Sequence, residues 1–381
     1  MRMIWKLVIF TLMLSLIMAN IPQKVDASVS VSARSAVLME QESGRVLFEK
    51  DAHTKRRIAS ITKIMTAVLA IESGKMSDIV KVSEQATRTE GSSVYLKPGE
   101  KIKLEHLVFG LMLRSGNDTA VAIAEYVGGS LDGFVYLMNQ KANEIGMLNT
   151  HFANPHGLDD HEDHYSTAYD MALLTRYAMQ YDKYREIAGT KEHHAPNPTE
   201  NWEREWKNKN RLLTKYKYTT GGKTGYTKRA KRTLVTTATK GEMNLIAVTI
   251  NAPDDWNDHI AMFENGFKAY DMAEVIPEGK LKLKENEDYK NQLYIKDSFV
   301  YPATKEEMEL FSVKYKLNKP PENWDRSKNN EAIVGRALVY LDEKVIKDMP
   351  IYYEALPEKK KGLFDSLKEI FLSILGVKMN G

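Results

Sequence analysis

The chain has 381 residues, of which 43% are hydrophobic and 28% are charged, and its net charge is +3. This composition is that of a folded globular protein, and the nearly neutral charge excludes the basic excess of a nucleic-acid-binding protein. Because the chain has no cysteine, neither disulfides nor thiolate metal sites can stabilise it. Its length favours two domains.

Residues 1–27 have the pattern of a secretory signal peptide. Arg2 and Lys6 are basic, residues 7–19 are mostly apolar, and Ala27 provides a small residue at the cleavage position. The apolar run is too short to favour a membrane-spanning helix, although an uncleaved anchor is the alternative. We therefore expect an exported protein that acts at the extracytoplasmic face of the cell membrane.

Residues 35–40 and 45–49 are apolar runs around a glycine-bearing loop, which predicts a β-hairpin. Residues 57–74 follow it. Between Ile64 and Ile71 only one residue is polar, and Gly74 stands where a helix would end, so this stretch predicts a buried helix. Ser60 opens the predicted helix, and Lys63 shares its face within one turn.

The pair Ser60 and Lys63 has the spacing of a nucleophile and its base. A serine hydroxyl is a poor nucleophile until a base removes its proton, and a lysine can be that base once burial lowers its pKa. The positive end of a helix would also stabilise a developing oxyanion. The alternative is an N-cap serine followed by an ordinary surface lysine, because short motifs recur by chance.

Residues 75–103 are polar and punctuated by glycine, which predicts loops with short strands. Residues 104–114, 119–127 and 134–145 have helical apolar spacing. The triplet S-G-N therefore lies in a turn between two buried helices. By itself it is a common capping turn, but Ser115 and Asn117 are also a candidate hydroxyl-plus-amide pair facing Ser60.

The stretch G-G-K-T-G-Y-T at residues 221–227 precedes two strand-like runs, 234–239 and 245–250. Lys223 and Thr224 are expected on or beside a strand, where they could hold a carboxylate. Gly225 would let a substrate backbone lie close. Alone, K-T-G is more often a solvated turn.

Beyond residue 271 the pattern becomes β-rich, in residues 292–301, 311–317, 334–341 and 344–347. It predicts a small antiparallel domain over residues 272–357, with a spacer or interaction role. Residues 358–381 begin with lysines and continue as an amphipathic helix, which predicts an in-plane membrane anchor. The alternative is a helix docked on its own domain.

Two clusters have less specific patterns. Residues 156–164 contain three histidines among carboxylates, but their spacing matches no recognised metal cage, so we expect neither a metal nor another cofactor. The basic residues Lys228, Arg229, Lys231 and Arg232 predict a solvated face. Attraction of an anionic wall polymer is the alternative.

The motifs S-x-x-K, S-G-N and K-T-G, in this order, resemble those of penicillin-binding proteins and serine β-lactamases. N-P-H-G-L at residues 154–158, Y-S-T-A-Y-D at 165–170 and N-K-N at 208–210 narrow the resemblance to D-alanyl-D-alanine carboxypeptidases, the low-molecular-mass penicillin-binding proteins. Residues 57–74 are similar to sporulation-associated members from endospore-forming bacilli. The resemblance covers residues 31–353, and it departs at Thr220, where the family often has aspartate.

The resemblance implies an α/β (α+β) penicillin-binding fold, with an antiparallel sheet and a helical lobe in residues 28–271. It implies that Ser60 attacks the bond between two D-alanines, that Lys63 is the base for acylation, and that Ser115 and Lys223 relay a proton to the leaving amine. The expected substrate-binding residues are Asn117 for the substrate amide, Thr224 for the terminal carboxylate, and Gly225 and Tyr226 beside it. Backbone N–H groups of Ser60 and Tyr226 would form the oxyanion hole.

The implied activity is removal of the terminal D-alanine from peptidoglycan stem pentapeptides through an acyl-enzyme, which limits cross-linking, with a role in the spore cortex. β-Lactam antibiotics would be covalent inhibitors. One alternative is a β-lactamase-like hydrolase, although no E-x-x-L-N segment lies between Asn117 and Lys223. A second is a non-catalytic protein that binds wall peptides.

Overall fold

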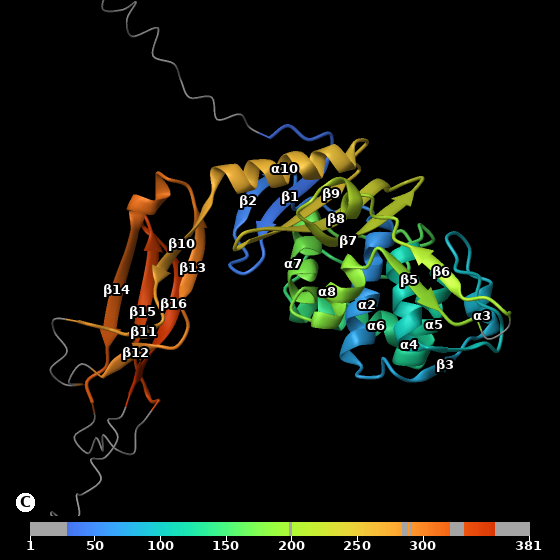
Figure 1. Ribbon diagram of the computed structural model, residues 1–381, viewed down its shortest axis with the longest axis horizontal. Coiled ribbons are helices and arrows are strands. Elements are labelled where there is room, and N and C mark those ends of the chain that lie inside the picture. Colours follow the sequence, from blue (N-terminus) through green and yellow to red (C-terminus); the bar gives the residue numbers. More distant parts are fainter. Residues whose placement is uncertain (1–28, 198–199, 284–288, 290–291, 321–330, 355–381) are drawn as a thin grey trace, which may run out of the picture. The chain divides into compact units, whose positions relative to one another are not determined.

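The computed structural model describes residues 29–197, 200–283, 289, 292–320 and 331–354 (Figure 1). The predicted signal peptide and the predicted C-terminal amphipathic helix lie outside these residues. The chain divides into two compact units, Met1–Thr239 with Asn244–Gly266, and Lys240–Met243 with Phe267–Gly381. None of the helices in the described ranges is long and apolar enough to cross a membrane.

The first unit is built on a five-stranded sheet in the order β2-β1-β9-β8-β7. The strands are β1 (Ser35–Glu40), β2 (Val46–Lys50), β7 (Thr219–Thr227), β8 (Lys231–Lys240) and β9 (Met243–Ile250). β1 pairs antiparallel with both β2 and β9, and β7 pairs antiparallel with β8. The predicted hairpin and the predicted sheet strand for K-T-G are therefore confirmed. K-T-G lies on the edge strand β7.

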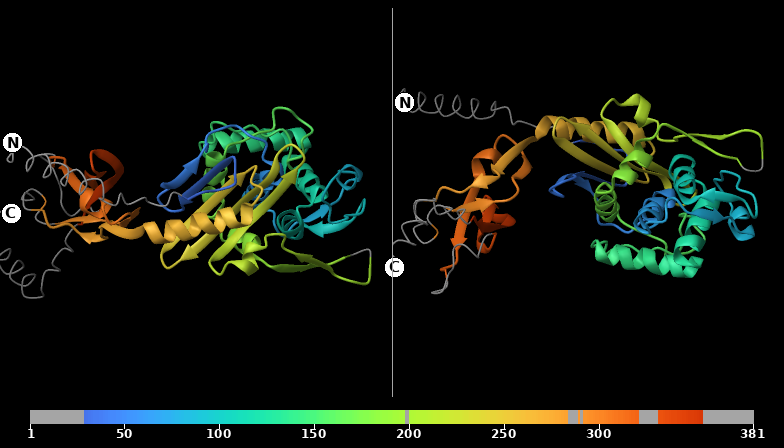
Figure 2. Two further views of the ribbon diagram at one scale, coloured as in Figure 1. Left: turned by 90° about the horizontal axis from the view of Figure 1, so that it is seen from above. Right: turned by 60° about the horizontal axis from the view of Figure 1, so that its bottom comes forward.

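Helices cover both faces of this sheet, with α10 (Asp255–Ala269) on one face and α2 (Lys63–Glu72), α7 (Ala168–Ala178) and α8 (Asp182–Gly189) on the other (Figures 1 and 2). The helical lobe also contains α3 (Glu84–Thr87), α4 (Leu104–Phe109), the π-helical η2 (Gly110–Arg114), α5 (Asn117–Gly128), α6 (Leu131–Glu144) and α9 (Leu212–Lys215). Two small antiparallel ribbons complete it, β3 (Ile79–Lys81) with β4 (Lys101–Lys103) and β5 (Glu192–Ala195) with β6 (Arg204–Lys207).

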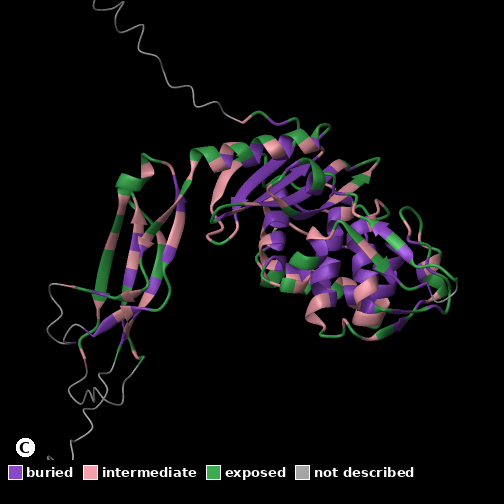
Figure 3. Ribbon diagram, viewed as in Figure 1, coloured by how far each residue is buried: buried purple, intermediate pink, exposed green. Residues whose placement is uncertain are grey.

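Helix α2 lies at the centre of this unit and is buried from Lys63 to Ala70 (Figure 3). The prediction of a buried helix is confirmed, but its start was placed too early. Ser60 belongs to the 3₁₀ turn η1 (Ala59–Thr62), and the α-helix begins at Lys63. Ala59 has a φ of 50°, a left-handed conformation that cannot continue a right-handed helix backwards.

Several elements were absent from the sequence prediction, α10 among them. The face of α10 that packs against the sheet carries polar residues, and these interrupt the regular spacing of apolar residues by which a buried helix is recognised in a sequence. His259 bonds to Thr236 and Thr249 on the sheet, and Asp258 accepts hydrogen bonds from the backbone and side chain of Ser32. These partners lie far away in the sequence, so the local pattern could not reveal them.

The second unit is a β structure, as predicted. Its larger sheet has the order β11-β12-β16-β15-β14, and β10 pairs with β13 in a smaller one. The strands are β10 (Asp271–Ile276), β11 (Gly279–Lys280), β12 (Leu293–Ile295), β13 (Phe299–Ala303), β14 (Phe311–Leu317), β15 (Ile333–Leu341) and β16 (Lys344–Tyr353), with a 3₁₀ turn η3 (Glu307–Leu310). A separate apolar core lies between them, around Leu293, Val339 and Ile351.

A glycine holds the Ser60 turn in place, and its substitution should unfold that region. Gly157 has a φ of 83°, and a Cβ added there would lie 1.9 Å from the carbonyl oxygen of Ala59. We expect Gly157→Ala to lower the free energy of unfolding by roughly 3 kcal/mol or more, through left-handed strain plus the backbone clash. Denaturant unfolding measures it.

Gly146 is a matched control, because its φ is also 83° but a Cβ added there meets nothing within 4 Å. Gly146→Ala should therefore show the conformational cost alone, about 1–2 kcal/mol. Equal destabilisation by the two substitutions would contradict this account of Gly157.

Candidate active site

Ser60 and Lys63 lie side by side because of the 3₁₀ turn that holds them. Residues three apart eclipse one another in such a turn, and Lys63 Nζ is 3.0 Å from Ser60 Oγ. Ser60 is half-buried, whereas Lys63 is completely buried. The hydroxyl is thus accessible from outside while the amine lies behind it.

Lys63 Nζ has two more oxygen partners, Asn117 Oδ1 at 2.7 Å and the carbonyl oxygen of His156 at 2.6 Å. Burial holds the pKa of Lys63 well below the ordinary lysine value, and the positive charges of Lys223 and Lys209 lower it further. A neutral amine has two N–H donors and one lone pair. Because the amide and carbonyl oxygens can only accept, the lone pair is left for the hydroxyl proton of Ser60.

The S-G-N triplet, residues 115–117, lies beside the pair Ser60 and Lys63. Ser115 has left-handed φ and ψ values of 64° and 35°, which end η2, and Asn117 is the first residue of α5. Helix α5 therefore begins two residues earlier than predicted, and only Ser115 and Gly116 form the turn. Asn117 Nδ2 donates to the carbonyl oxygen of Glu90 at 2.6 Å, which orients its Oδ1 toward Lys63.

The edge strand β7 brings K-T-G against the Ser60 turn. A Cβ added at Gly225 would lie 2.9 Å from the backbone nitrogen of Ser60 and 2.3 Å from Thr233 Oγ1, so glycine permits this close packing. Thr220, where the sequence departs from the resemblance described above, bonds through its Oγ1 to Thr237 Oγ1 of β8 at 2.7 Å. A threonine pair thus supports the strand at the point where the sequence departs from the family.

Lys223 is buried and connects β7 to the S-G-N turn. Its Nζ is 3.0 Å from Ser115 Oγ and 2.7 Å from the carbonyl oxygen of Thr224. Burial, followed by the charge of Lys209, lowers the pKa of Lys223 to about 7. This amine is therefore able to gain or lose a proton near neutral pH.

A cavity of about 550 Å³ opens in front of these groups. Ser60, Ser115, Thr224, Gly225 and Tyr226 line it, and Tyr226 is 64% exposed. Lys63, Asn117 and Lys223 lie behind its wall, buried. All eight residues predicted from the three motifs therefore come together around one cavity.

Seven lining residues were not among the predicted site residues, namely Ser92, Asn208, Lys209, Arg211, Arg232, Asp255 and Trp256. Arg232 had been assigned to a solvated basic face, but it pairs with Asp255 at 2.6 Å, and its buried Nε has no hydrogen-bond partner among the described residues. Successive side chains of a strand point to opposite faces of the sheet, so Lys231 and Arg232, which are neighbours on β8, could not both belong to the same face. Lys209 belongs to the N-K-N motif, but the motif alone did not predict that this residue lines the cavity.

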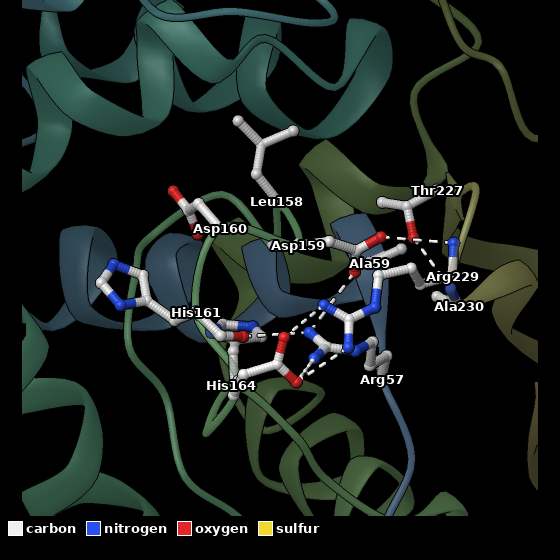
Figure 4. A network of polar contacts seen from close by, with 12 residues as sticks. Arg57, Ala59, Leu158, Asp159, Asp160, His161, His164, Thr227, Arg229 and Ala230 are labelled. Carbon is white, nitrogen blue, oxygen red and sulfur yellow. Dashed lines mark hydrogen bonds and ion pairs between the residues drawn. The ribbon is translucent and has the colours of Figure 1, made fainter.

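The histidine-rich loop supports the Ser60 turn from outside the cavity. His164 Nε2 bonds to Thr62 Oγ1 at 2.8 Å, and burial lowers the pKa of His164 to about 3. On the surface of the loop, Glu162 bonds to both Arg57 and Arg229, in the network shown in Figure 4. In the described ranges, no three histidine, aspartate or glutamate side chains are placed to hold a metal ion.

Comparisons with known proteins show the family of this chain. Residues 21–254 match the family described as D-alanyl-D-alanine carboxypeptidase, peptidase S11, and residues 270–358 match the C-terminal domain of penicillin-binding protein 5. The chain is 35% identical over 348 residues to D-alanyl-D-alanine carboxypeptidase DacF of Bacillus subtilis (strain 168), a match covering 88% of each chain. It is 40% identical over 269 residues to DacC of Escherichia coli (strain K12), covering 67% of this chain and 66% of DacC.

The fold is likewise that of solved relatives. Penicillin-binding protein 5 from Haemophilus influenzae superposes with a TM-score of 0.70 at 25% identity, covering 85% of this chain and 97% of that one. The predicted family and fold class are confirmed. This chain belongs to the D-alanyl-D-alanine carboxypeptidases of the peptidase S11 family, the serine-type DD-peptidases related to penicillin-binding proteins.

Proposed function

We propose that this protein removes the terminal D-alanine from peptidoglycan stem peptides, with Ser60 as the nucleophile and Lys63 as its base. The observation that carries the proposal is the buried amine 3.0 Å from a half-buried hydroxyl at the wall of a cavity. A lysine kept neutral by burial is a competent base near neutral pH.

The reaction proceeds in two steps. Ser60 Oγ attacks the carbonyl carbon of the penultimate D-alanine, and its proton passes to Lys63. The C–N bond then breaks, while Ser115 and Lys223 deliver a proton to the leaving amine. Water then attacks the ester, so that its hydroxyl forms the carboxylic acid product and its proton restores the Ser60 hydroxyl, while the proton held by Lys63 replaces the one that Lys223 gave up.

The remaining groups bind and orient the substrate. Asn117 holds the substrate amide, and Thr224 binds the terminal carboxylate beside Gly225 and Tyr226. The backbone N–H groups of Ser60 and Tyr226 stabilise the oxyanion. The cations of the cavity, including Arg232, favour a substrate that ends in a free carboxylate.

The proposal is tested with the mature chain and a labelled penicillin. We expect one covalent adduct, located at Ser60 by mass spectrometry, because the β-lactam carbonyl takes the place of the scissile one. Ser60→Ala should form no adduct and should release D-alanine from a D-Ala-D-Ala pentapeptide roughly 10⁶-fold more slowly, or not at all.

Two other outcomes would favour the alternatives. Rapid turnover of penicillin without a lasting adduct would indicate a β-lactamase-like hydrolase. A pentapeptide that binds but survives incubation with the unsubstituted protein would indicate a non-catalytic wall-peptide-binding protein.

The charge of Lys209 should set the pH range of activity. Its positive charge lowers the pKa of both Lys63 and Lys223. Removing it in Lys209→Met makes the protonated forms of both lysines less unfavourable, so both pKa values rise and less free base is present at a given pH. We expect the acid limb of the profile of kcat/KM against pH to move to higher pH.

Lys209→Arg is the matched control, because it keeps the positive charge and should leave the acid limb in place. An unmoved limb in Lys209→Met, or an equal movement in both variants, would count against Lys63 as the titrating base.

The proposal also covers the two domains and the segments at either end of the chain. Residues 1–27 are a signal peptide for export, residues 28–271 and 272–357 are the two domains, and residues 358–381 anchor the protein to the membrane surface. The amphipathic pattern of the last segment supports the anchor, and the similarity of residues 57–74 supports a spore-cortex role.

A chain ending at residue 357 should stay soluble with vesicles of anionic lipid while the full chain pellets; equal pelleting would contradict the anchor.

A further inference from the structure

A second cavity, of about 300 Å³, lies in the first unit on the other side of one loop. Ser92 lines the active-site cavity, whereas the next three residues, Ser93 to Tyr95, line the second one. The two cavities are also close along the chain at β6, since Arg204 and Trp206 line the second cavity and Lys209, just beyond the strand, lines the first. The reaction proposed above uses no residue of the second cavity.

Two aromatic rings are displayed there. Tyr95 is 82% exposed and Trp202 is 60% exposed, although rings of this size are usually largely buried. Trp206, only 5% exposed, provides a buried apolar surface. Exposed aromatic rings that line a hollow are typical of a binding surface.

The loop that carries Tyr95 is held rigidly. Tyr95 has a left-handed φ of 61°, which is unfavourable for a bulky residue. The buried carboxylate of Asp118 maintains this shape by accepting hydrogen bonds from Ser93 Oγ at 2.6 Å and from the backbone N–H groups of Val94 and Leu96. Since Asp118 follows Asn117 directly, the ring is positioned by the same helix end that contacts Lys63.

Most charged side chains that line the second cavity are already in ion pairs within the protein, including Glu205, which pairs with Lys207 at 2.5 Å. Lys97 bonds to Glu200 at 2.5 Å, and Arg204 bonds to Glu100 at 2.5 Å. Arg114 donates to a backbone carbonyl oxygen. A strongly ionic ligand would have to break these pairs, whereas a neutral ligand with many hydroxyl and amide groups can hydrogen-bond to their outer atoms.

We propose that this cavity binds a sugar ring of the glycan strand that carries the stem peptide. Aromatic rings can cover the apolar face of a pyranose, and the surrounding polar groups can bond to its hydroxyl and acetamido groups. The volume lies at the lower end for small-molecule pockets, which suits about one or two rings. An extended pentapeptide spans about 17 Å, so its sugar is expected outside the Ser60 cavity.

This inference rests on the proposed function, and substrates with and without sugar test it separately. Wild-type protein should cleave a disaccharide-linked pentapeptide with a higher kcat/KM than the free pentapeptide. Trp202→Ala and Tyr95→Ala should reduce that advantage about tenfold, mainly through KM, and leave cleavage of the free pentapeptide unchanged. Tyr136→Ala is the matched control, because this α6 tyrosine is 69% exposed and lines neither cavity.

A binding measurement needs no catalysis. A β-1,4-linked tetramer of N-acetylglucosamine, without peptide, should perturb the tryptophan fluorescence of the Ser60→Ala protein, and Trp202→Ala in that background should abolish the response. Absence of the response in the parent, or an equal sugar advantage in all variants, would overturn the sugar site. Failure to release D-alanine from either pentapeptide would instead overturn the proposed function, while the fluorescence result would still decide the sugar site.

Discussion

The structure of the site depends on one buried amine that pairs directly with no carboxylate of the described residues. Lys63 Nζ lies among three oxygen atoms, those of Ser60, Asn117 and His156, at 2.6–3.0 Å. Lys63 is completely buried and the positive charges of Lys223 and Lys209 are near, so its charged form is unfavourable and the folded-state pKa lies below the unfolded one. Folding is therefore destabilised at pH values below the ordinary pKa of lysine, and this cost disappears above it. The protein thus keeps an amine whose burial is energetically unfavourable at the position where the reaction requires a base.

The nucleophile turn is held mainly by close backbone packing, not by charge. Gly157 lies against the carbonyl oxygen of Ala59 on one side, and Gly225 lies against the backbone of Ser60 on the other. Thr233 Oγ1 donates to the carbonyl oxygen of Ile58 at 3.0 Å. The exposed network around Glu162 is screened by solvent and contributes less. Small side chains are thus needed on both sides, because a methyl group would displace the nucleophile.

The start of helix α5 connects the proposed base, Lys63, to the loop that lines the second cavity. Its first residue, Asn117, contacts Lys63, and its second, Asp118, fixes the loop between the two cavities. A change in the start of this helix would therefore affect the base and the loop together. Such coupling through a shared rigid element requires no conformational change.

The sequence by itself determined the contacts that act within one turn or one strand. Ser60 and Lys63 had to be neighbours because three residues separate them, and the apolar runs defined α2 and the sheet strands. The order of the three motifs identified the family. The spacing and apolar patterns are local, whereas the family signal needed all three motifs in order but no knowledge of how they pack together.

Only the tertiary structure decided which distant groups meet. Lys63 contacts Asn117 and His156, Lys223 contacts Ser115, and β8 directs Arg232 into the cavity. Helix α10 escaped prediction because its buried polar residues find partners on the sheet, and η1 replaced the first turn of α2 because Ala59 is left-handed. Such contacts arise when the core packs, and the free energy of that packing depends on residues far apart in the chain.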